Sequence, residues 1–213
     1  MNFNKFKEIL TKIESLPLPG QASQFKMSPP FREKLISLQK DNIKRARKAA
    51  VMALFYPNKN KEACIVLILR ETYKGVHSAQ IGFPGGKIEE EDDTLKHTAL
   101  RETEEEIGVA IHAIEVVKQL TSIYIPPSNF YVYPFMGVSI STPKFVKQDS
   151  EVKAVIEVAV SDFFDEKNTT TKLVSTKYKK EVAVPAYNLN GHLVWGATAM
   201  ILSEVKDLLK ELL

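Results

Sequence analysis

The chain has 213 residues, of which 44% are hydrophobic and 26% are charged, and its formal net charge is +3. This length suits one catalytic domain with an extension, and the composition is that of an ordinary globular protein. No apolar run approaches the roughly 20 residues that span a bilayer, so we expect no membrane partner. The lysines are spread over several segments, which argues against a polymeric nucleic acid as partner.

The start of the chain and its cysteine content bear on the cellular compartment. Residues 1–7 interleave polar and apolar side chains and lack the continuous apolar stretch of a secretory signal, which predicts a cytoplasmic protein. Cys64 is the only cysteine, so no internal disulfide can form. The sequence leaves the oligomeric state open, with a homodimer as one option.

The N-terminal part of the chain indicates a helical arm. Apolar residues recur at helical spacing over residues 3–13 and stop at a Pro-Leu-Pro segment at 17–19. Residues 21–46 contain two adjacent prolines and charged, weakly periodic sequence. We therefore predict an N-terminal helical arm over residues 1–46, packed against a main domain of residues 47–213.

Several short apolar runs predict strands. Residues 49–56 and 63–69 are rich in β-branched or aromatic side chains and flank a polar turn, which favours a buried hairpin. Further strands are expected at residues 116–125 and 131–140. Between alternating residues near the end of the chain, Asn190-Gly191 is a strong signal for a two-residue hairpin turn.

Two helices complete the predicted fold. One is expected at residues 94–107, and the apolar pattern after Gly196 predicts a second near the end of the chain. Strands and helices mix without strict alternation. This order predicts an α/β (α+β) fold in which a mixed β-sheet is covered by helices.

The residues that indicate chemistry lie at 83–109, where a glycine loop leads into an acidic helix. Asp92 or Asp93 is expected to cap this helix, because a carboxylate there accepts hydrogen bonds from unpaired first-turn N–H groups. Glycine at position 108 is expected to end it. Helical geometry places the carboxylates of Glu102, Glu105 and Glu106 within an arc of roughly 100°, whereas Glu104 points elsewhere.

Like charges this close together destabilise a helix unless something compensates for them. A divalent cation such as Mg²⁺ would do so, because it prefers carboxylate oxygens and shares its remaining positions with water and substrate phosphates. The alternative is a solvated acidic face in which Arg101 pairs with Glu105 one turn away. Judged on the helix alone, the two interpretations stand level.

The loop and the helix together resemble the Nudix box, commonly written G-x5-E-x7-R-E-U-x-E-E-x-G-U with U a bulky apolar residue. The positions in register are Arg101, Glu102, Glu105, Glu106, Gly108 and Val109. Gly86 lies one residue further upstream than this spacing requires, Asp93 stands where the first glutamate belongs, and Thr103 replaces the bulky residue. On these residues the chain resembles the Nudix hydrolase family, which implies a Nudix-like mixed sheet sandwiched between helices.

The resemblance also implies roles for these residues. Glu102 and Glu106 become the leading ligands of Mg²⁺ or Mn²⁺, and the carbonyl of Gly86 is expected to complete the metal shell. Glu105 is either a further metal ligand or the base for the attacking water. Arg101 is expected to orient Glu105. The catalytic set implied by the resemblance is therefore Glu105, Glu102 and Arg101.

The segment before the glycine loop resembles the coenzyme A pyrophosphatase branch of the family, whose upstream signature reads roughly L-L-T-x-R-[SA]-x3-R-x3-G-x3-F-P-G-G. The chain keeps Leu67, Arg70 and the final Phe-Pro-Gly-Gly. Gly75 replaces the second arginine, and Ala79 replaces the first glycine. The resemblance implies that Arg70 contacts substrate phosphates, and His77 is a further candidate for substrate binding.

The substrate implied by the resemblance is a small nucleoside-diphosphate derivative, with coenzyme A or an acyl-CoA first. The departures in the upstream signature keep a nucleotide sugar or a dinucleotide as alternatives. A non-catalytic binding module with the same fold is the alternative from another class, and the intact glutamate set argues against it. Glu151 resembles the position where relatives supply another acid, and the sequence leaves open whether it joins the site.

Overall fold

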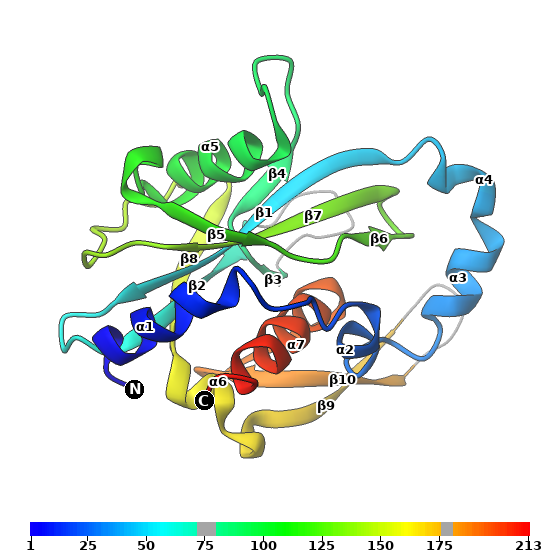
Figure 1. Cartoon of the computed structure of the whole chain (residues 1–213). Helices are drawn as coiled ribbons and strands as arrows, with labels where there is room; N and C mark the ends of the chain where they lie inside the picture. Colours follow the sequence, from blue (N-terminus) through cyan, green and yellow to red (C-terminus); the bar gives the residue numbers. More distant parts are fainter. Residues whose placement is uncertain (72–79, 176–180) are drawn as a thin grey trace.

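The computed structural model describes residues 1–71, 80–175 and 181–213, and Figure 1 shows how the elements are arranged. The strands of the main sheet are β1 (Arg47–Pro57), β2 (Ala63–Arg70), β3 (Ile81–Gly82), β4 (Gly85–Lys87), β5 (Glu115–Gln119), β6 (Ile123–Ile125), β7 (Phe130–Val138) and β8 (Val152–Ala159). The strands of a smaller sheet are β9 (Thr169–Val174), β10 (Val182–Leu189) and β11 (His192–Trp195). The helices are α1 (Phe3–Ile13), α2 (Gln21–Phe25), α3 (Arg32–Leu38), α4 (Lys40–Ile43), α5 (Leu95–Ile107), α6 (Val160–Phe164) and α7 (Gly196–Lys210), with short 3₁₀ turns η1 (Ile111–Ala113) and η2 (Glu166–Asn168).

The centre of the main sheet is β1, which pairs with strands on both sides. Its second half forms the predicted antiparallel hairpin with β2, and its first half pairs antiparallel with β4. On the other side β1 runs parallel to β7, so the sheet is mixed, as expected. β8 pairs antiparallel with β2, and β6 pairs antiparallel with β7.

Both faces of the main sheet are buried, because alternate side chains of β1 enter two different apolar clusters. Met52 and Leu54 pack with residues of α5, whereas Ala53 and Phe55 pack with residues of α1 and α7. A strand buried on both faces reads as a continuous apolar run, which explains why the hairpin was recognisable from the sequence. Figure 1 shows α5 on one face of the sheet, and α1 and α7 on the other. The predicted sheet between helices is confirmed.

The N-terminal segment packs onto the rest of the chain. α1 buries Phe3, Phe6, Leu10 and Ile13 at helical spacing, which confirms the predicted amphipathic helix. The Ser203 hydroxyl of α7 donates a hydrogen bond of 2.8 Å to the carbonyl of Ser23 in α2. These contacts tie the segment to α7. The division into an arm of residues 1–46 and a domain of residues 47–213 stays a prediction.

The single strand expected at residues 116–125 is wrong, because the chain there forms β5 and β6 with a break between them. At the break, the backbone N–H of Thr121 donates to the carboxylate of Glu204 in α7 at 3.2 Å. The strand expected at residues 131–140 is β7, displaced by one or two residues at each end. No helix in the described ranges has the length and apolar character that crossing a membrane requires.

The hairpin predicted at Asn190-Gly191 is confirmed. Leu189 of β10 pairs with His192 of β11, and both turn residues have positive φ, 49° and 77°. This conformation is the one that an Asn-Gly pair favours in a two-residue turn. The predicted C-terminal helix follows as α7, which begins at Gly196 directly after β11.

Candidate active site

The acidic helix α5 begins and ends through backbone capping. Its N-cap is Thr94, whose hydroxyl accepts a hydrogen bond of 3.1 Å from the backbone N–H of His97. The expected cap by Asp92 or Asp93 is therefore wrong. Gly108 ends the helix with a left-handed φ of 72°, as expected. A residue with a side chain would be strained in that conformation.

Glu102 and Glu106 of α5 lie against β4, Glu105 is held by Arg101, and the three side chains differ sharply in exposure. The side chain of Glu106 is 1% exposed and that of Glu102 is 12% exposed, whereas that of Glu105 is 56% exposed. Glu104 is exposed, and Ile107 is in the core beneath the helix. The helix thus offers two largely buried carboxylates and one that reaches solvent.

Glu106 is the most buried of these acids, and its two oxygens have different surroundings. Oε2 accepts a hydrogen bond of 2.8 Å from the backbone N–H of Gly85 in β4. Oε1 lies 3.1 Å from Nη1 of Arg70 but receives no hydrogen bond from the described residues, so this contact is one of charge alone. Burial raises the pKa of Glu106 to about 7, against the lowering effects of Arg70 and the Gly85 N–H.

Glu102 lies against the backbone of β4 at Gly86. A Cβ atom at Gly86 would be 2.4 Å from the carboxylate of Glu102, so only glycine leaves room for this carboxylate. Oε1 of Glu102 is 3.1 Å from Nη2 of Arg101. Burial raises the pKa of Glu102, and the nearby charges of Glu105 and Glu151 add to this effect.

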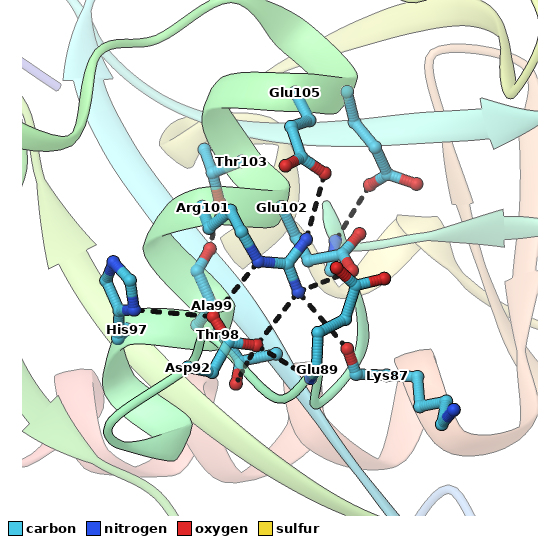
Figure 2. Close-up of polar contacts among 12 residues, drawn as sticks. Lys87, Glu89, Asp92, His97, Thr98, Ala99, Arg101, Glu102, Thr103 and Glu105 are labelled. Atoms are coloured by element: carbon cyan, nitrogen blue, oxygen red, sulfur yellow. Dashed lines mark hydrogen bonds and ion pairs between the residues drawn. The ribbon is translucent and has the colours of Figure 1, made fainter.

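Arg101 lies at the centre of the polar network in Figure 2. Its guanidinium forms a two-pronged contact with Asp92, through Nε to Oδ1 at 3.0 Å and Nη2 to Oδ2 at 2.9 Å. It also donates to Glu105 at 2.9 Å and to the carbonyl of Lys87 at 3.2 Å. The predicted pairing of Arg101 with Glu105 is therefore present. Asp92 provides a fixed anchor on the other side of the arginine.

Asp92 is the site residue whose role was missed from the sequence. Its buried carboxylate accepts from the hydroxyl of Thr98 and from the backbone N–H of Glu89, both at 3.0 Å. The hydrogen bonds from Arg101 hold the pKa of Asp92 well below its usual range, and in turn raise the pKa of Arg101. A signal was available, because counting five residues on from Gly86 leads to Asp92, whereas counting back from Arg101 leads to Asp93.

The expected substrate-binding residues have different outcomes. Arg70, at the end of β2, contacts Glu106 and also donates to the carbonyl of Gly85 at 3.3 Å. His77 lies outside the described residues. Glu151 is exposed, but its negative charge contributes to raising the pKa of both Glu102 and Glu106. The structure therefore brings Arg70 and Glu151 close to the glutamates of α5.

The donor atoms at this site suit a hard divalent cation. Among residues 1–71, 80–175 and 181–213, no three acidic, histidine or cysteine side chains already form a cluster able to hold a metal ion. The glutamates nonetheless offer only oxygen ligands, they repel one another, and Oε1 of Glu106 is buried without a hydrogen bond. Carboxylate oxygens with unmet negative charge are the ligands that Mg²⁺ and Mn²⁺ prefer.

Comparison with known proteins agrees with this geometry. A family model described as the NUDIX domain matches residues 46–177. The chain belongs to the Nudix hydrolase family. The resemblance noted in the sequence is thus confirmed, and the loop–helix segment with its glutamates lies within the matched range.

Two curated relatives are similar over most of this Nudix chain. The mitochondrial coenzyme A diphosphatase NUDT8 of Homo sapiens is 28% identical over 158 residues, which cover 74% of this chain and 67% of that protein. The mitochondrial Nudix hydrolase 15 of Arabidopsis thaliana is 28% identical over 178 residues, which cover 81% of this chain but only 62% of that protein. The chain therefore spans only part of the length of these relatives.

Two solved structures show the same fold at low sequence identity. A MutT/nudix family protein from Enterococcus faecalis has a TM-score of 0.50 at 16% identity, covering 78% of this chain and 62% of that one. The Nudix hydrolase RenU from M. smegmatis has a TM-score of 0.50 at 12% identity, covering 79% of this chain and 88% of that one. These likenesses support the Nudix fold.

Proposed function

We propose that this Nudix protein is a Mg²⁺- or Mn²⁺-dependent hydrolase that cleaves the pyrophosphate bond of a small nucleoside-diphosphate derivative, with coenzyme A or an acyl-CoA as the first candidate. The observation that carries the proposal is the placement of Glu102 and Glu106 beside the glycines of β4, with Glu105 held by Arg101 on the same helix. Two of these carboxylates are largely buried and one reaches solvent. A structural acidic helix face would leave all three in water.

Glu102 and Glu106 would be the principal metal ligands, with Glu105 and the Gly86 carbonyl as further ones. When bound, the cation would withdraw charge from a pyrophosphate oxygen and make a coordinated water more acidic. Glycine at position 86 keeps the Glu102 carboxylate in place, because any larger residue would displace it. The Gly85 N–H fixes one oxygen of Glu106, and the other has no hydrogen bond from the described residues.

Glu105 is our candidate for the base that accepts a proton from the attacking water, with metal ligation as its alternative role. Its side chain is the most exposed of the three glutamates and is held by Arg101 at 2.9 Å. Arg101 is itself fixed by Asp92 and by the carbonyl of Lys87, so it can orient Glu105 without contacting substrate. Precise orientation matters because displacement at phosphorus depends on positioning and on charge neutralisation.

Coenzyme A is placed first among substrates on two grounds. The upstream signature is partly retained, with Arg70 close to the glutamates. The relative NUDT8 is named a coenzyme A diphosphatase, at 28% identity. The replacement of the second signature arginine by Gly75 keeps a nucleotide sugar or a dinucleotide as alternatives. A cytoplasmic location and a homodimer remain expectations, and the two relatives named above are mitochondrial by name.

A hydrolysis screen with Mg²⁺ or Mn²⁺ tests the proposal. Coenzyme A, an acyl-CoA, a nucleotide sugar and a dinucleotide are incubated with the purified chain, and the products are separated by chromatography. Cleavage of coenzyme A should yield an adenosine bisphosphate and a phosphopantetheine compound, and should stop with EDTA. Preferred cleavage of another diphosphate would overturn the coenzyme A assignment. Absence of any metal-dependent cleavage would favour a non-catalytic binding module.

A further inference from the structure

Arg70 was expected to face substrate phosphates, yet its guanidinium lies on Glu106. The Nη1 atom is 3.1 Å from Oε1 of Glu106 and 3.3 Å from the carbonyl of Gly85. The side chain is 25% exposed, so it borders solvent while it touches a carboxylate that is almost fully buried. Arg70 therefore contacts the buried acid while part of its side chain is in solvent.

The two arginines of the site are held very differently. Arg101 has an anchor apart from the α5 glutamates, because Asp92 binds it through two hydrogen bonds. Among the described residues, the printed contacts of the Arg70 guanidinium are with Glu106 and with the carbonyl of Gly85, which both belong to the glutamate site. Its contact with Glu106 also lacks hydrogen-bond alignment. Within the part of the chain that the structure describes, Arg70 is thus the arginine that can leave its position without breaking a separate ion pair.

A divalent cation and Arg70 would compete for the same oxygen. Mg²⁺ binds oxygen at about 2.0–2.1 Å, so a cation on Oε1 of Glu106 would be no more than about 5 Å from Nη1 of Arg70. Two positive charges at that separation repel each other, and more strongly where water is partly excluded. Because Oε1 has no hydrogen bond to lose, the guanidinium is the partner that moves.

We propose that Arg70 is the internal counter-ion of Glu106 in the metal-free protein, and that binding of a divalent cation releases its guanidinium to hold the substrate's pyrophosphate. This inference rests on the proposed function and adds an order of events to it. The Arg70 side chain would thus neutralise Glu106 when the site has no metal and bind the substrate's pyrophosphate when the metal is present. It also places a positive charge 3.1 Å from the buried carboxylate before any metal arrives.

The test compares Mn²⁺ binding to the parent and to Arg70→Gln in the absence of substrate, by calorimetry or by electron paramagnetic resonance. Arg70→Gln should bind Mn²⁺ about tenfold more tightly, which corresponds to about 1.4 kcal/mol, because the competing charge is gone. With Mn²⁺ present, the same variant should bind inorganic pyrophosphate about tenfold more weakly. Unchanged or weaker Mn²⁺ binding by Arg70→Gln would overturn the inference, and so would unchanged pyrophosphate binding.

Two further variants serve as controls for the binding measurements. Arg47→Gln is the matched control, because Arg47 stacks over Phe130 at 4.2 Å and points to the sheet face opposite α5. Its Mn²⁺ affinity should stay within about twofold of the parent, since an exposed remote charge is screened. Arg70→Lys should keep near-parent Mn²⁺ affinity but bind pyrophosphate more weakly, because lysine lacks the two-pronged geometry of a guanidinium.

Thermal unfolding in EDTA provides a readout that needs neither metal nor substrate. Arg70→Gln should lower the melting temperature, since it leaves Glu106 without its counter-ion, and the double variant Arg70→Gln/Glu106→Gln should recover most of that loss. If the changes in melting temperature caused by the two substitutions were additive, Arg70 and Glu106 would not be interacting, and the inference would be wrong. If the hydrolysis screen fails while Mn²⁺ binding tightens in Arg70→Gln, the proposed function falls and the counter-ion role stands.

Discussion

Two helices of this Nudix protein each bury a glutamate, and the two acids are satisfied to different degrees. Glu204 of α7 is fully buried, and its oxygens accept hydrogen bonds from Gln24 at 2.9 Å and from the backbone N–H of Thr121 at 3.2 Å. Glu106 of α5 is equally buried, but one of its oxygens has a charge contact and no hydrogen bond.

We interpret this difference as one between a structural acid, Glu204, and an acid that we propose binds the metal, Glu106. Glu204 links α7 to α2 and to the break between β5 and β6, so each of its two oxygens accepts a hydrogen bond within the fold. Glu106 has one oxygen without a hydrogen bond from the described residues, and burial raises its pKa. Burial of an acid therefore does not by itself mark an active site. The informative feature is a buried acid whose hydrogen-bonding capacity is incompletely filled.

The largest effect is expected from Glu106→Gln, which should lower kcat at least about a hundredfold with Mg²⁺, because it removes a ligand charge from the site. The fold should persist, since an amide in this buried position needs no counter-ion. Steady-state kinetics on the best substrate of the screen, together with thermal unfolding in EDTA, provide the measurement. Near-parent activity in this variant would show that Glu106 does not bind the metal.

The next effect concerns Asp92, whose removal should cost about 3 kcal/mol of unfolding free energy because Arg101 would lose its buried partner. Asp92→Asn should also lower activity by loosening Arg101 and hence Glu105. Denaturant unfolding of the parent and the variant at pH 7 measures the first effect. Asp93→Asn is the control, because the carboxylate of Asp93 is exposed. This substitution should change the free energy of unfolding by less than about 0.5 kcal/mol.

The same pair of variants predicts a pH dependence. The folded pKa of Asp92 lies below that of the unfolded chain, which is about 3.9, so its stabilising effect is complete well above that pH. As the pH falls through the unfolded pKa, the unfolded chain binds the proton first, and the stabilisation declines. The stability difference between parent and Asp92→Asn should therefore shrink from pH 6 towards pH 3. A constant difference would argue against the ion pair as its cause.

The fold was largely predictable because its main signals are local. The hairpin of β1 and β2 follows from two apolar runs and a polar turn, and Asn190-Gly191 has a turn conformation that few other residue pairs adopt. The break between β5 and β6 was not predictable from its own residues, because at the break the backbone N–H of Thr121 bonds to Glu204, which is distant in the sequence. Local patterns contain no information about such a partner.

The candidate site shows the same division. Helical spacing grouped Glu102, Glu105 and Glu106 and set Glu104 apart, whereas burial separates Glu102 and Glu106 from Glu104 and Glu105, which are both exposed. The choice of Asp92 as helix cap failed because Arg101 takes its carboxylate, which leaves Thr94 to cap the helix. Arg70 was expected at substrate and lies on Glu106, because in the folded protein the buried charge is the nearest partner. These outcomes depend on competition between partners, which spacing alone does not rank.

Glu204→Gln should destabilise the fold by about 1–3 kcal/mol and leave the chemistry intact at temperatures where the protein is folded. Both partners of Glu204 are hydrogen-bond donors, so the NH₂ group of glutamine would face a donor on one side and leave it unsatisfied. Denaturant unfolding combined with kinetics at 15 °C or below separates the two readouts. A hundredfold loss of kcat in folded Glu204→Gln would contradict the contrast with Glu106.

The smallest effect is expected from Glu104→Gln, which removes a charge of the same sign two residues from Glu106 on the same helix. Glu104 is exposed, and its backbone carbonyl accepts a hydrogen bond of 2.8 Å from the Gly108 N–H. Substitution of the side chain leaves that bond intact. Stability should therefore change by less than about 0.5 kcal/mol and kcat by less than about twofold, since an exposed charge is screened by salt. Parallel kinetics on Glu104→Gln and Glu106→Gln at 150 mM salt make the comparison direct. Equal losses in the two variants would mean that total negative charge on α5 matters, and not the position of each carboxylate around the helix.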